Sequence, residues 1–93
     1  MPRYLVERQF NVGQEQMTVL GRRSREIARD QFPGITWHHS HVAIDEEGHV
    51  QTFCVYEALS EDDILRHAQE LGSHEVLRVS EIVGDVTPDD FPL

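Results

Sequence analysis

Three of the six histidines in this chain fall within four residues, in the stretch "GITWHHSHVAID" from Gly34 to Asp45. His39 and His41 are two residues apart, so on a β-strand their side chains point to the same face. Two imidazoles on Cα atoms roughly 6.5–7 Å apart can converge on one metal ion. Strand histidines also fill half-buried interfaces, where they hydrogen-bond to neighbours. The residues alone leave metal binding and interface packing as open alternatives.

The histidine strand is expected to pair with a second strand across the turn "DEEGH". A tight turn at Glu47 and Gly48 predicts that Val42 pairs with Phe53, which places His41 across from Cys54 and His39 across from Tyr56. One face of this hairpin then collects Val42, Ile44, Phe53 and Val55, ready to pack against helices. The other face collects Trp37, His39, His41, Thr52, Cys54 and Tyr56. A thiolate with two imidazoles suits zinc, nickel or copper rather than magnesium or calcium.

A second group of candidates is expected on the helix side of the same hairpin. His38 is predicted to point there, together with Glu57 at the end of its strand, while His67 approaches from the second helix. A hydrogen bond from Glu57 would orient the His67 imidazole, as residues behind a metal ligand do. The same pair also fits a purely structural role.

The elements that position these residues follow from the apolar periodicity. Strands are expected over residues 3–10, 35–44, 50–57 and 75–83, and helices over residues 17–31 and 60–72. Ser60 is a suitable N-cap and Gly72 a suitable residue to end the second helix. The buried stripe of that helix is expected to consist of Ile64, Leu65, Ala68 and Leu71. The order βαββαβ predicts an α+β, ferredoxin-like fold, in which a four-stranded antiparallel sheet carries two helices on one face.

One domain over residues 1–83 and an extended tail over residues 84–93 are expected from these boundaries. The other face of such a sheet would carry Trp37, Cys54 and Tyr56, which are too apolar to leave in water. A chain of 93 residues is also near the lower limit for a self-sufficient core. Both points predict a homodimer of the α+β barrel type, in which two sheets pack face to face and enclose the histidines.

Composition excludes several classes of function. The net charge of −9 argues against nucleic-acid binding and favours cations as small partners. The chain contains no lysine, so Schiff-base chemistry and a P-loop lysine are excluded. No apolar run is long enough to span a membrane, and no signal peptide is evident. The only cysteine, Cys54, allows no intrachain disulfide. We therefore expect a cytoplasmic protein.

Several segments resemble a bacterial family of short proteins: "MPRYLVER" at the start, "SHV" after Trp37, "GHVQTFCVYEA" from Gly48, and "RHAQELG" from Arg66. One branch of this family binds nickel. The resemblance implies a ferredoxin-like fold, a homodimer and nickel as the metal. By position in the motifs, the histidine-rich ligand set of that branch is matched by His39, Cys54, Glu57 and His67. His41 stands where that branch tends to have an aromatic residue, and "VERQF" stands where it has histidines.

Three functional hypotheses follow. The first is a metal-binding module that holds a divalent transition ion, nickel by resemblance and zinc or copper as alternatives, with His39, His41, Cys54, Glu57 and His67 as candidate ligands. The second is a small dimeric enzyme of the oxygenase or isomerase type, with a pocket near His67, Glu57 and Tyr56. The third is a non-catalytic interaction module in which the histidines only fill an interface.

Overall fold

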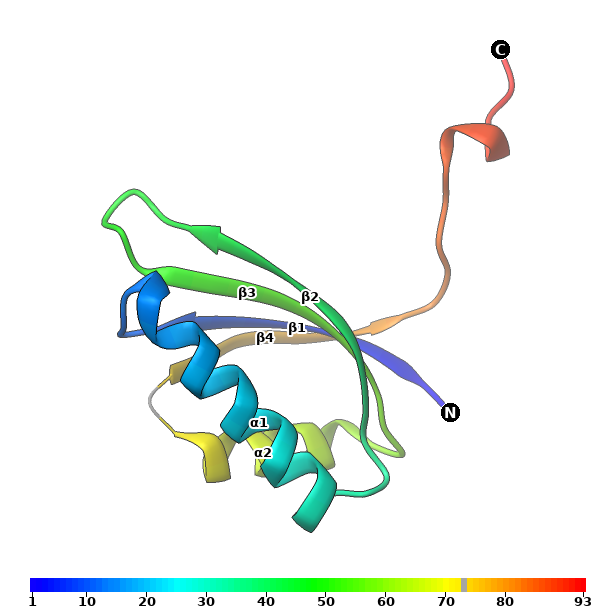
Figure 1. The fold of residues 1–93 in the computed structure, drawn as a ribbon. Coiled ribbons are helices and arrows are strands. Elements are labelled where there is room, and N and C mark those ends of the chain that lie inside the picture. Colours follow the sequence, from blue (N-terminus) through cyan, green and yellow to red (C-terminus); the bar gives the residue numbers. More distant parts are fainter. Residues whose placement is uncertain (73) are drawn as a thin grey trace.

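The chain folds into one sheet and two principal helices in a computed structural model, which describes residues 1–72 and 74–93 (Figure 1). The elements in chain order are β1 (Arg3–Phe10), a short 3-10 helix (Gln14–Gln16), α1 (Met17–Gln31), β2 (Thr36–Ile44), β3 (Val50–Glu57), α2 (Glu61–Leu71), β4 (His74–Ile82) and a second 3-10 helix (Pro88–Asp90). The sheet order is β2-β3-β1-β4, and every neighbouring pair is antiparallel. The predicted α+β, ferredoxin-like fold is therefore confirmed.

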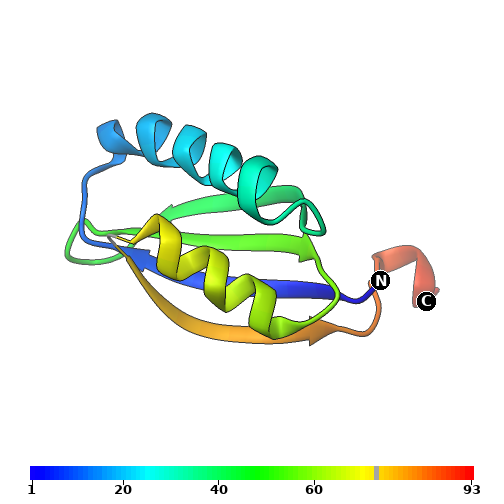
Figure 2. The same cartoon turned by 90° about the horizontal axis from the view of Figure 1, so that it is seen from below.

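Both helices lie on the same face of the sheet, which gives two layers (Figure 2). Alternate residues of β1 are buried against the helices, beginning with Tyr4 and Val6. Ser60 caps α2 by accepting a hydrogen bond from the Asp63 backbone N–H at 3.4 Å, and Gly72 ends the helix with a positive φ of 66°. Both terminal signals were predicted from the sequence. We call the helix-free side of the sheet the open face.

The turn between β2 and β3 is one residue longer than the sequence predicted. The backbone N–H of Asp45 donates to the His49 carbonyl at 2.9 Å, which leaves three residues in the loop. The Asp45 carboxylate accepts hydrogen bonds from the backbone N–H groups of Glu47 and His49, at 2.9 and 2.8 Å. Gly48 takes φ 84°, as the last position of a three-residue hairpin loop requires. The Asp45 side chain therefore stabilises the longer loop.

This turn shifts the β2–β3 register by one residue and overturns the predicted distribution of side chains. Val42 pairs with Thr52 and His41 with Phe53, whereas we predicted that Val42 pairs with Phe53. The predicted hairpin faces are therefore wrong, because Cys54 and Tyr56 are buried on the helix side. A second irregularity at His38 brings Trp37 opposite Tyr56, so Trp37 also turns toward the helices. Val42 keeps its predicted place on the helix side, and the histidine pair stays on the side opposite to Val42.

The buried stripe of α2 differs from the prediction at one position. Ile64, Ala68 and Leu71 are buried as expected, but Leu65 is 38% exposed and His67 is buried in its place. A residue three positions from Ile64 lies on the same helix face, whereas an adjacent residue does not. No helix in the described ranges, 1–72 and 74–93, is long and apolar enough to cross a membrane.

Beyond Ile82 the chain leaves the sheet and runs away from the body of the molecule (Figure 1). Arg3 on β1 holds the start of this segment through an ion pair with Asp85 at 2.7 Å. Val86, Phe91 and Leu93 on the same segment are exposed.

Candidate functional site

The two histidines of the predicted pair lie side by side on the open face. Their ring centroids are 5.5 Å apart and the rings are nearly perpendicular, at 85°. His39 stands opposite Val55 and His41 opposite Phe53, on the edge strand β2. Both imidazoles are exposed. The expectation that the two share one face is met, because side-chain alternation along a strand does not depend on register.

His38 lies beside Glu57 at the end of β3. Its Nε2 atom lies 3.4 Å from Oε1 of Glu57. The irregularity in β2 pairing falls at His38, and such bulges redirect a side chain. Glu57 follows Val55 on the open face, so the carboxylate lies on the same side of the sheet as the histidine pair. The predicted hydrogen bond between Glu57 and His67 is therefore not formed.

His67 lies on the opposite side of the sheet and links the two helices. Its Nε2 atom is 3.0 Å from the backbone carbonyl of Ser24 on α1. Because a carbonyl only accepts, Nε2 carries the proton in this bond. The ring also packs against Phe32 and Tyr56, with centroids 5.8 and 6.2 Å apart. His67 thus holds α2 against α1 in this structure.

Cys54 is likewise buried on the helix side, where its Sγ donates to Oγ1 of Thr52 at 3.3 Å. The five candidate ligands are thus divided by the sheet. His39, His41 and Glu57 lie on the open face, and Cys54 and His67 lie under the helices. The trio of the enzyme hypothesis is divided in the same way, because Tyr56 and His67 are on the helix side and Glu57 is not.

The burial of His67 predicts a loss of stability in acid. Burial lowers the pKa of His67, and the neighbouring Arg8 and His74 lower it further. Burial also lowers the pKa of His74. In the unfolded chain both histidines protonate near pH 6.5. Below about that pH the unfolded state binds protons that the folded state does not, so the free energy of unfolding falls until the folded-state pKa values are reached.

Urea denaturation at about pH 7.5 and about pH 5.5 measures this loss. The variant His67→Gln retains a donor for the Ser24 carbonyl but cannot titrate. We expect it to lose less stability between the two pH values than the parent chain. An equal loss in both proteins would contradict this assignment.

The open face carries few of the side chains that could bind a metal ion. Within residues 1–72 and 74–93, no three His, Cys, Asp or Glu side chains gather closely enough to hold one. His39 and His41 supply two imidazoles, which suit nickel, zinc and copper. Their nitrogens would have to approach to about 3 Å, since such metal–nitrogen bonds are about 2 Å long. In the described part of one chain, His39 and His41 are therefore too few to complete a four-ligand site by themselves.

A buried arginine on the helix side was missed by the sequence analysis. Arg8 on β1 is only 2% exposed, and its guanidinium carbon lies 5.2 Å from the centroid of the Tyr56 ring. Its Nε and Nη2 atoms have no hydrogen-bond partner within the described part of the chain. The sequence did indicate this burial, because the alternation in "YLVERQF" places Arg8 on the same side of the strand as Tyr4, Val6 and Phe10, which are apolar.

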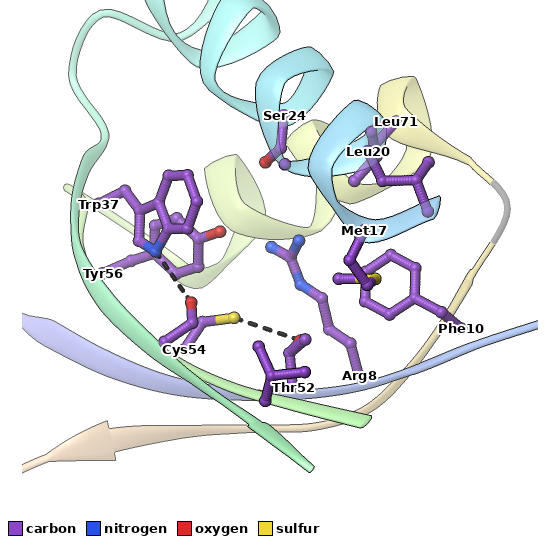
Figure 3. A pocket seen from close by; sticks show the side chains of 13 residues that line it. Arg8, Phe10, Met17, Leu20, Ser24, Trp37, Thr52, Cys54, Tyr56 and Leu71 are labelled. Atoms are coloured by element: carbon purple, nitrogen blue, oxygen red, sulfur yellow. Dashed lines mark hydrogen bonds between the residues drawn. The ribbon is translucent and has the colours of Figure 1, made fainter. Parts of the chain in front are cut away.

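Arg8 projects into a cavity of about 150 Å³ between α1 and the sheet (Figure 3). Phe10, Met17, Leu20 and Leu71 supply apolar walls, and Ser24, Thr52 and Tyr56 supply hydroxyl groups. Burial raises the pKa of the Tyr56 hydroxyl to about 12, so this group stays protonated and can donate.

A four-stranded antiparallel sheet with two helices on one face defines a small ferredoxin-like protein, and an imidazole pair lies on the other face of its sheet. The family model described as "Nickel responsive protein SCO4226-like" matches residues 4–82. The chain therefore belongs to this nickel-responsive family, which confirms the family resemblance. A search of curated proteins found no match.

Proposed function

We propose that this chain is a cytoplasmic nickel-binding protein that acts as a homodimer and holds the ion through His39 and His41. The observation that carries the proposal is the adjacency of the two exposed rings, 5.5 Å apart, on the face that the helices leave free. Membership of a nickel-responsive family favours Ni²⁺ over the zinc and copper that imidazoles also bind. The net charge of −9 attracts divalent cations to the surface.

A second copy of the chain is the proposed source of the missing ligands. The original reason for a dimer, an open face bearing Cys54 and Tyr56, no longer applies. The open face instead presents Leu5, Phe53 and Val55, which are half-buried although no helix covers them. Packing two such faces would bury these side chains and bring a second imidazole pair, and the Glu57 carboxylate of the same face, toward the first.

Titration of the untagged protein with Ni²⁺ by calorimetry tests the proposal. We expect stoichiometric binding above about pH 6.5, where imidazoles are neutral, and its loss on acidification. The double variant His39→Ala/His41→Ala is expected to weaken Ni²⁺ binding by at least about 100-fold, because both proposed donors are removed. Both side chains are exposed, so the variant should keep its fold.

His49→Ala is the matched control, since it removes one imidazole at the far end of the hairpin. Binding in this variant should equal that of the parent chain. Sedimentation equilibrium with and without Ni²⁺ measures the assembly. Unchanged binding in the double variant would move the site away from the histidine pair, and a monomer in both conditions would contradict the dimer.

A further inference from the structure

We propose that the cavity under α1 is a binding site for a small monocarboxylate, with Arg8 as its cationic anchor. This site lies on the side of the sheet opposite to the histidine pair and goes beyond the proposed metal binding. The observation behind it is a buried cation that has no counter-ion among residues 1–72 and 74–93. None of the ion pairs in the described part of the chain includes Arg8.

Two nitrogen atoms of Arg8 indicate the shape of the ligand. Nε and Nη2 lie on the same edge of the guanidinium plane, and neither has a hydrogen-bond partner among the residues that the structure describes. This edge presents two parallel N–H groups, which is the arrangement that a carboxylate accepts with both oxygens. A charge taken out of water is costly unless it is paired, so an ion pair between Arg8 and a bound carboxylate would offset the cost of burying the guanidinium.

The rest of the cavity favours an apolar group attached to the carboxylate. Figure 3 shows the guanidinium rising from β1 between Tyr56 on one side and Phe10 and Met17 on the other, with Ser24 above it. A cavity of about 150 Å³ accepts a ligand of benzene size, or about six non-hydrogen atoms. Butyrate has this size and combines a carboxylate with a short hydrocarbon chain.

Charge argues for a monoanion rather than phosphate or a dicarboxylate. Arg8 supplies one positive charge, and no second arginine lines the cavity. The chain as a whole carries −9, so it repels a dianion more strongly than a monoanion. Access lies between α1 and the edge strand β2, where Trp37 and Val42 line the cavity and remain partly exposed.

Trp37 is the only tryptophan in the chain, so its fluorescence reports directly on the cavity. We expect sodium butyrate to change the emission of the full chain in a saturable manner at constant ionic strength. Butyramide, which has the same shape without the charge, and inorganic phosphate should each bind at least about 10-fold more weakly. Equal binding of butyramide or of phosphate would overturn the proposal, as would the absence of saturation with butyrate.

Two variants test the site by different means. Arg8→Met should weaken butyrate binding at least about 10-fold, because it removes both charged donors. Gly21→Leu should weaken butyrate binding by filling part of the cavity, because Gly21 lines it. Arg8 is unchanged in this variant, and a Cβ added at Gly21 meets nothing within 4 Å. Leucine also favours a helix more than glycine does, so α1 should be retained.

Arg78→Met is the matched arginine control, because Arg78 lies on the open face beside Glu7. Butyrate binding should be unchanged in this variant and also in His39→Ala/His41→Ala. The second comparison separates the carboxylate site from the metal site, so either proposal can fail without the other. Parent-like butyrate affinity in Arg8→Met, with its fold confirmed by circular dichroism, would overturn the assignment of Arg8.

Discussion

Replacing Arg8 by methionine is expected to raise the free energy of unfolding by about 1–4 kcal/mol when no carboxylate is present. The native side chain holds a charge that is 2% exposed and has no ion-pair partner in the described part of the chain, and its guanidinium carbon lies 5.2 Å from the centroid of the Tyr56 ring. Methionine is nearly as long, needs no hydrogen bonds and adapts to irregular space beside Phe10 and Met17. In urea denaturation this change appears as a higher urea concentration at the midpoint of unfolding, while the dependence of the unfolding free energy on urea concentration stays the same.

Arg78→Met serves as the control for this stability prediction. The Arg78 side chain is 72% exposed, and its Nε lies 3.7 Å from Glu7. Its replacement should change the free energy of unfolding by less than about 0.5 kcal/mol. A loss of stability in Arg8→Met would show that packing and the contact with Tyr56 outweigh the cost of burying the charge. A stabilised variant that no longer binds butyrate would indicate that the chain retains Arg8 for its ligand.

The second large effect is expected from Ile64→Ala, which should lower the free energy of unfolding by about 2–5 kcal/mol. Ile64 on α2 is 1% exposed and belongs to the cluster that contains Val6, Cys54 and Tyr56. Alanine favours the helix, so the cost arises from the cavity and not from helix propensity. Each kcal/mol should lower the melting temperature by about 4–8 °C in a domain of this size.

Leu65→Ala is the adjacent control, because Leu65 loses the same kind of side chain from a position that is 38% exposed. Its cost should stay below about 1 kcal/mol. Thermal unfolding followed by circular dichroism compares the two variants directly. Equal losses of stability in the two variants would mean that Leu65 is as buried as Ile64, as the sequence pattern predicted.

The secondary structure and its order could be predicted because they depend on local periodicity. Alternation in "RYLVERQF" and the apolar spacing of the two helical segments do not require knowledge of distant contacts. The hairpin register could not be obtained in this way. It is determined by the Asp45 side chain, whose two hydrogen bonds to the loop backbone stabilise a three-residue turn over a tighter one.

In the candidate site too, features that depend on local alternation could be predicted, and features that depend on the hairpin register could not. His39 and His41 share a face whatever the register, so their adjacency could be predicted. The position of Cys54 opposite a histidine depended on the register, and the structure places the thiol under the helices instead. Arg8 was overlooked because a charged residue in a strand is normally exposed, although the alternation of its neighbours indicated burial.

The Asp45 carboxylate makes the chemistry of both sheet surfaces depend on the conformation of one turn. A relative that lacks this carboxylate and closes the same residues with a two-residue turn at Glu47 and Gly48 would shift β2 by one position against β3. Its imidazoles would then face the cavity, and Ser40 and Val42 would face outward. The turn conformation at this hairpin is therefore a means by which evolution can change which β2 side chains line the cavity without altering any strand residue.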